Sequence, residues 1–292
     1  MGHNHSHNTV GNMKIAFFLN LIPAIIEFVG GILTNSVAIM SDALHDLGDS
    51  FSVGLAWFLE KYSNKKRTDL FSYGYKRFSL LGAFINGVIV LIGSVFILYR
   101  AIPRLINPEP SNAYGMILLA ILGIIANGIG VYKTAKGKTL NQKVISLHLL
   151  EDFLGWIAVL IVSIVLMFTD LYILDPILSV LITLYILWGV VKNLRKTILL
   201  FLQATPENLN THDVDEKLKK IKNIYDIHDT HIWSLDGEHN ILSTHIVIND
   251  NVKSEDIEKV KKESKLKLED IGIQHSTIEI EYKREQCNDY CE

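Results

Sequence analysis

The sequence has 292 residues, a formal net charge of −3 and 49% hydrophobic side chains. This length allows one membrane domain and a small soluble domain, and the near-neutral charge does not favour a nucleic-acid partner. Long apolar runs continue to about residue 200, and Lys, Asp and Glu dominate from about residue 205 onward. We therefore place a domain boundary beside Pro206.

Six segments are long and apolar enough to cross a bilayer, for which a helix needs about 20 mostly apolar residues. We predict spans over Ile15–Leu33, Val37–Leu59, Phe78–Tyr99, Tyr114–Tyr132, Val144–Phe168 and Leu171–Val191. The first segment contains Asn20 and Glu27 and has no A-x-A cleavage site. It is interpreted as a retained helix and not as a secretory signal.

Basic residues are concentrated in alternate loops, which predicts the orientation of the chain. They follow the second, fourth and sixth spans and are Lys61, Lys65, Lys66, Arg67, Lys76, Arg77, Lys133, Lys136, Lys138, Lys143, Lys192, Arg195 and Lys196. The first and fifth loops have none. Both termini are therefore predicted in the cytoplasm, and the composition fits a bacterial cell membrane.

The tail is predicted to be a small α+β domain. Helices are expected over Val214–Ile224 and Ser254–Leu268, and strands over Tyr225–Leu235, Asn240–Ile248 and Ser276–Tyr282. The predicted parts are a His-rich disordered segment 1–12, a six-span transport domain 13–204, the tail domain 205–284 and a final segment 285–292. Cys287 and Cys291 in that last segment are either inert thiols or a soft-metal binding end.

The second and fifth spans carry ionisable side chains, although one such group at a helix centre costs about 2.5–3.5 kcal/mol. They are Asp42, His45, Asp46 and Asp49 in the second span and His148, Glu151 and Asp152 in the fifth. We expect these groups to face the bundle interior, a water-filled cavity or an ion. Asp42 is expected to line an ion path or to hydrogen-bond a ligand.

His45 and Asp49 are four residues apart, and so are His148 and Asp152. Residues i and i+4 share one face of a helix, so each helix presents one imidazole and one carboxylate to the same point. If the two spans pack together, two His and two Asp suit a tetrahedral Zn²⁺ site. Imidazole favours Zn, Co, Ni, Cu or Fe over the oxygen-preferring Ca²⁺ and Mg²⁺.

Three other interpretations compete with a transported metal. Polar groups can simply hold helices together, but two matched H-x-x-x-D pairs on separate spans favour a metal. An intramembrane metalloprotease needs a catalytic glutamate, as in H-E-x-x-H, and neither His45 nor His148 is followed by one. We therefore do not expect an enzyme. A metal-gated channel is the third alternative, and saturable, proton-linked exchange would distinguish a transporter from it.

The segments Asn35–Ser50, NSVAIMSDALHDLGDS, and His148–Asp152, HLLED, resemble the cation diffusion facilitator family, in particular its cobalt–zinc–cadmium efflux branch of zinc transporters. The other matches are short motifs spread along the chain. They are Gly30-Gly31, Tyr73-Gly74-Tyr75-Lys76-Arg77, Asp175-Pro176, His228-Asp229 and His231-Ile232-Trp233. The resemblance extends from about Lys14 to Tyr282.

The resemblance implies a homodimer in which each subunit has a six-helix transmembrane bundle and a cytoplasmic ferredoxin-like domain. It implies export of Zn²⁺ from the cytosol in exchange for protons, with Cd²⁺, Co²⁺, Ni²⁺ or Fe²⁺ as alternative substrates. Carried over residue by residue, the transport site consists of His45, Asp49, His148 and Asp152. A His at the first of these positions goes with a preference for zinc.

The resemblance also implies metal sites outside the transport site. The tail positions that match a regulatory zinc site are His228, His245, Glu279 and Glu281, with His231 and His275 as substitutes. Relatives that bind metal after the second span use His where this chain has Phe71 and Tyr75, so that site is not expected here. His3, His5 and His7 are interpreted as a flexible metal collector, with an incidental cluster as the alternative.

Overall fold

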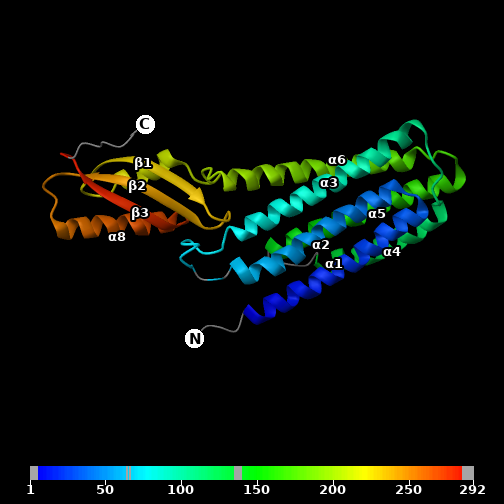
Figure 1. Ribbon diagram of the computed structural model, residues 1–292, viewed down its shortest axis with the longest axis horizontal. Helices are drawn as coiled ribbons and strands as arrows, with labels where there is room; N and C mark the ends of the chain where they lie inside the picture. The colour runs from blue at the N-terminus through cyan, green and yellow to red at the C-terminus, as the bar shows by residue number, and fades with distance from the viewer. Residues whose placement is uncertain (1–5, 64, 66, 135–139, 285–292) are drawn as a thin grey trace. The chain divides into compact units, whose positions relative to one another are not determined.

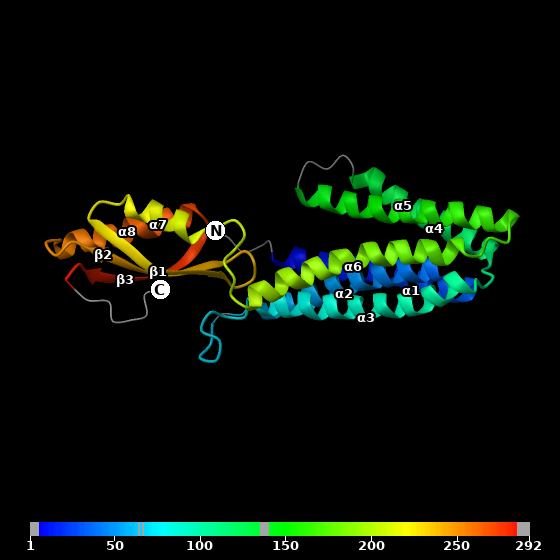
Figure 2. The same ribbon diagram turned by 90° about the horizontal axis from the view of Figure 1, so that it is seen from above.

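The computed structural model describes residues 6–63, 65, 67–134 and 140–284, and it divides into two compact units. The first unit comprises residues up to Lys61 together with Gly82–Leu194. The second comprises Tyr62–Leu81 and the chain from Arg195 onward. Figures 1 and 2 show the helical bundle of the first unit and the small sheet with its helices in the second.

Six long helices occupy the six predicted spans (Figure 1). They are α1 (Ser6–Thr34), α2 (Val37–Ser63), α3 (Phe78–Ile106), α4 (Ala113–Thr134), α5 (Leu140–Phe168) and α6 (Leu174–Phe201). Among the described residues, all of these except α2 contain an apolar stretch long enough to cross a membrane. α2 has the length but is interrupted by Asp42, Asp46 and Asp49.

The first helix is longer than its apolar segment. α1 begins at Ser6, within the segment 1–12 for which the sequence predicts disorder. A helix can continue past the apolar segment because its backbone groups bond to one another whatever the side chains are. His7 falls in this first turn, but its side chain lies outside the description, and His3 and His5 lie outside the described residues.

Glycines allow the neighbours of α2 to approach it closely. A Cβ on Gly31 of α1 would lie 2.8 Å from Cγ of Met40 in α2. A Cβ on Gly48 of α2 would collide with Val90 of α3. Small residues at such contacts let membrane helices pack by van der Waals contact, which replaces the hydrophobic effect as a driving force in lipid. α2 is therefore held against both α1 and α3.

An aspartate at the start of α6 caps the N-terminus of α2. The Asp175 carboxylate accepts hydrogen bonds from the Ser36 hydroxyl, from the Val37 backbone N–H at 2.8 Å and from the Ala38 N–H at 3.4 Å. The first N–H groups of a helix have no partner within it, so a carboxylate from another helix both satisfies and anchors them. This contact fixes the position of α2, and so of the acidic residues that it carries.

The tail domain has the order α7 (Thr211–Lys219), β1 (Ile224–Ser234), β2 (Asn240–Ile248), α8 (Ser254–Asp270) and β3 (Ile273–Tyr282). β2 is the central strand, antiparallel to β1 and parallel to β3. α7 and α8 pack on one face of the sheet, where Leu218, Ile246 and Leu268 are among the buried core residues (Figure 2). The predicted α+β domain is confirmed.

The turn between β1 and β2 starts their pairing, and a bulge between His228 and His231 then shifts the register by one residue and places two histidines side by side. Asp236 accepts hydrogen bonds from the N–H of Glu238 at 3.0 Å, the N–H of His239 at 2.8 Å and the His239 ring. Burial acts to raise the pKa of Asp236, but these bonds outweigh it and hold the pKa below its usual value. In the resulting register His228 is opposite His245.

We expect Asp175→Asn to lower the thermal stability of the full-length protein. The amide offers one acceptor oxygen without charge, so buried donors at the start of α2 lose their partner, at a cost of about 1–3 kcal/mol. Melting followed by size-exclusion chromatography measures the effect. Asp170→Asn is the control, because Asp170 is exposed and its described hydrogen bond is to Tyr172. Equal melting temperatures for both variants would contradict the capping role.

Candidate metal centre

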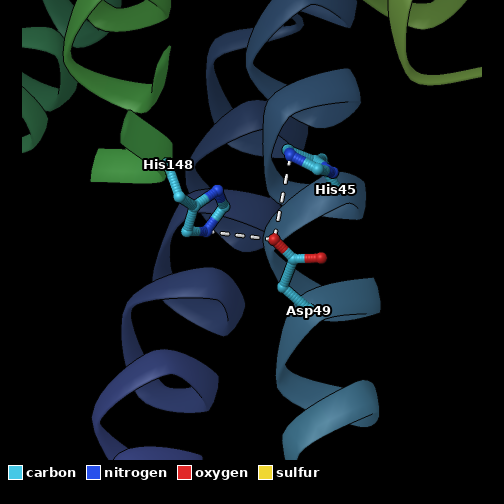
Figure 3. Close-up of side chains that lie close together, drawn as sticks. All are labelled: His45, Asp49 and His148. Atoms are coloured by element: carbon cyan, nitrogen blue, oxygen red, sulfur yellow. Dashed lines mark ion pairs between the residues drawn. The ribbon is translucent and has the colours of Figure 1, made fainter. Parts of the chain in front are cut away.

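The two H-x-x-x-D pairs face one another between α2 and α5. Asp49 lies between the two histidines, with its Oδ2 3.1 Å from Nε2 of His148 and 3.8 Å from Nε2 of His45 (Figure 3). The two imidazole rings are 5.8 Å apart between centroids and meet edge to face. Ligand atoms of His45, Asp49 and His148 all lie within 4.8 Å of one another.

The fourth predicted ligand lies beside this group. Asp152 Oδ2 is 3.7 Å from Nε2 of His148, and its side chain is 9% exposed, against 28% for His45. The structure therefore brings His45, Asp49 and His148 within reach of one ion. It also puts the carboxylate of Asp152 next to His148. Two imidazoles and carboxylate oxygens form a donor set that suits a tetrahedral transition metal, in particular Zn²⁺.

Asp42 of α2 is buried beside α5, next to the site. Asp42 is 6% exposed, and its Oδ1 would lie 3.5 Å from a Cβ on Gly155. One turn after Asp152, the fully buried Trp156 packs against Gly123 of α4 and belongs to the same core cluster as Ile39 of α2. This packing joins α2, α4 and α5 one turn away from Asp152.

One acidic residue near the site was not identified as functional from the sequence. Glu27 of α1 is 9% exposed, and its carboxyl group interacts with that of Asp46. Asp42 and Asp152 are within electrostatic reach of Glu27. The sequence did show an acid near the middle of an otherwise apolar span. An ionised side chain without a partner is energetically unfavourable inside a membrane, so Glu27 could have been singled out on that ground. The sequence could not reveal that α1 turns this acid toward α2.

A second group of possible ligands lies on the tail sheet, on β1, β2 and β3. His245 Nδ1 is 2.5 Å from Glu281 Oε1, and His228 Nε2 is 3.2 Å from Glu281 Oε2. Ligand atoms of these three residues lie within 4.8 Å of one another. His228 Nε2 is buried and makes no aligned hydrogen bond among the described residues. In the tautomer that leaves Nε2 unprotonated, His228 would offer this nitrogen to a cation.

The remaining predicted tail ligands lie outside this group of three. Glu279 is 67% exposed, and its Oε2 is 3.7 Å from His245 Nε2. His231 is exposed and bonds to Asp229 at 2.9 Å. His275 contacts the ring of Tyr73 in the loop before α3, and both belong to the same compact unit. Cys287 and Cys291 lie outside the described residues.

Both parts of the chain match family models. Residues 13–202 match the cation efflux transmembrane domain, and residues 206–283 match the cytoplasmic domain of cation efflux proteins. The chain belongs to the cation efflux family, the cation diffusion facilitators, within the branch that handles zinc, cadmium and cobalt. It is a multi-pass membrane transporter and not an enzyme.

Relatives resemble the chain over nearly its whole length. An antiporter from Bacillus velezensis, named for cadmium, cobalt and zinc/H(+)-K(+), is 35% identical over 96% of this chain and 92% of its own. The zinc transporter ZitB of Pectobacterium atrosepticum is 30% identical over 99% of this chain and 91% of its own. The cation efflux protein CzcD of Cupriavidus metallidurans is 31% identical over 96% of this chain and 90% of its own.

Proposed function

We propose that this protein exports Zn²⁺ from the cytosol in exchange for protons. The observation that carries the proposal is the grouping of His45, Asp49 and His148 around one point between α2 and α5. These donors bind a transition metal only when the imidazoles are neutral and the carboxylate is ionised, so metal and protons compete for the same groups. A site that faces each side of the membrane in turn converts this competition into exchange.

The relatives support the choice of ions. One is named for zinc, cadmium and cobalt and for exchange against H⁺ and K⁺, and another is named a zinc transporter. We assign Zn²⁺ as the main substrate here because two imidazoles and one or two carboxylates match its tetrahedral preference. Cd²⁺ and Co²⁺ are further substrates of the same ligand set. Asp152 is assigned as the fourth ligand, reaching the ion after a small movement.

We further propose that both termini are cytoplasmic and that the protein works as a homodimer. The orientation rests on Lys and Arg in alternate loops. The dimer rests on the match to the cytoplasmic domain of cation efflux proteins. Export from the cytosol follows from this orientation when the proton gradient is directed inward.

We expect Asp49→Ala to reduce zinc flux by about 100-fold or more, because the shared carboxylate between the two histidines is lost. Zinc and proton fluxes in proteoliposomes with an imposed pH gradient measure the effect. Glu151→Gln is the control. Glu151 is adjacent to Asp152 in α5, but its side chain is exposed and accepts a hydrogen bond from Tyr185 at 2.7 Å. If the wild-type protein transported zinc without any counterflow of protons, the proposed exchange would be refuted.

We propose that the tail group of His228, His245 and Glu281 binds a regulatory zinc ion. The three side chains come from three neighbouring strands, so a bound ion would fix their relative positions and bias the equilibrium between conformations of the dimer. Glu279 is assigned as an additional ligand from the exposed side. The N-terminal histidines, His3, His5 and His7, are proposed as a collector that delivers metal to the transporter.

We expect His245→Ala to remove one class of zinc-binding site from the full-length protein while leaving the transport site intact. The variant should need a different zinc concentration for half-maximal activity and should keep its proton coupling. Equilibrium dialysis and flux assays on the same preparation measure both effects. His231→Ala, an exposed histidine on the neighbouring strand, should match the wild type. Unchanged zinc stoichiometry in His245→Ala would exclude the tail site.

A further inference from the structure

Glu27 is a buried acid in a helix that otherwise crosses the membrane as an apolar segment. It is the one charged residue in the span Phe17–Thr34 of α1, and it is 9% exposed. Its Oε2 has no hydrogen-bond partner among the described residues. Burying an ionised carboxylate without a compensating charge is very unfavourable, so such a group takes up a proton or a cation.

Among the described residues, the ionisable groups that act on Glu27 are acidic. They are Asp46 and Asp42 of α2 and Asp152 of α5. α4 also packs on α1, through Leu119 against Gly30, and has no charged residue before Lys133. No lysine or arginine therefore balances Glu27 within the described part of the bundle.

The buried carboxyl groups of Glu27 and Asp46 interact directly with each other. Two ionised carboxylates only accept hydrogen bonds, so Glu27 and Asp46 can bond to each other only when one of them holds a proton. Glu27 is the partner that comes from outside the metal-binding helices. Helix packing alone would not need an acid here, because an amide or an apolar side chain fills the same space without the desolvation cost.

We propose that Glu27 binds a proton that is exchanged against the transported metal, at a position separate from the metal ligands. This inference rests on the proposed Zn²⁺/H⁺ exchange and names a residue on α1 that carries part of it. When Zn²⁺ binds between α2 and α5, its two positive charges stabilise the ionised form of the carboxyl group nearby. The O–H bond of Glu27 then breaks, the proton leaves to water, and no electrons are transferred.

The test counts the protons released when Zn²⁺ binds to the full-length protein in detergent. Isothermal titration calorimetry in buffers of different ionisation enthalpy gives this number at each pH. We expect Glu27→Gln to bind Zn²⁺ and to release roughly one proton fewer per subunit than the wild type. Its zinc affinity should also fall less steeply as the pH is lowered. Glu151→Gln, the matched control on α5, should release the wild-type number.

The outcomes separate this inference from the proposed function. Equal proton release by Glu27→Gln and the wild type overturns the role of Glu27 and leaves the exchange intact. A wild type that binds zinc without releasing protons overturns both. If Glu27→Gln does not fold, Glu27→Asp keeps a titratable group and should release the wild-type number of protons at a shifted pH. Release at an unshifted pH would overturn the inference.

Infrared difference spectroscopy provides a measurement that needs no folded glutamine variant. Addition of Zn²⁺ to the wild type should remove the C=O stretching band of a protonated carboxyl group. That band should move in Glu27→Asp, because its carboxyl group has a different environment. A wild type in which zinc removes no protonated-carboxyl band contradicts the proposal.

Discussion

The approach of α5 to α2 is the contact on which the rest of this structure depends. Each helix alone would carry ionisable side chains at a cost of about 2.5–3.5 kcal/mol per group in the membrane. Together they place Asp49 between His45 and His148, so that the contacts of its carboxylate with the two imidazoles offset part of that cost. The cap from Asp175 and the small residues Gly31 and Gly48 hold α2 where this meeting occurs.

The sequence predicted that His45, Asp49 and His148 come together, because helix geometry is regular. A spacing of four residues puts His45 with Asp49, and His148 with Asp152, without any knowledge of the fold. It could not predict how the two helices would be rotated and shifted relative to each other. That arrangement makes Asp49 the shared carboxylate and leaves Asp152 beside His148 alone. It also could not place Glu27, because α1 has no second acid with which a spacing could be measured.

The tail could be predicted from its turn and its alternating strands. Asp236-Gly237 fixed the hairpin, and the observed β2 has the predicted bounds. The ligand positions were harder, since a strand puts both Glu279 and Glu281 on one face and only tertiary packing distinguishes them. Glu281 points between the two histidines, and Glu279 stays 67% exposed at the side. The start of α1 also differed from expectation, because the polar segment before Ile15 carried no signal that the helix continues.

Zinc located by anomalous diffraction in the full-length protein tests the central claim most directly. The account predicts a zinc peak between α2 and α5, bonded to His45, Asp49 and His148 at about 2.0–2.2 Å, with Asp152 drawn in as the fourth ligand. The peak should be lost in Asp49→Ala, while any zinc peak on the tail sheet is retained. This result would identify Asp49 as a ligand of the metal between α2 and α5. A protein that transports zinc but holds no metal between these two helices would contradict it.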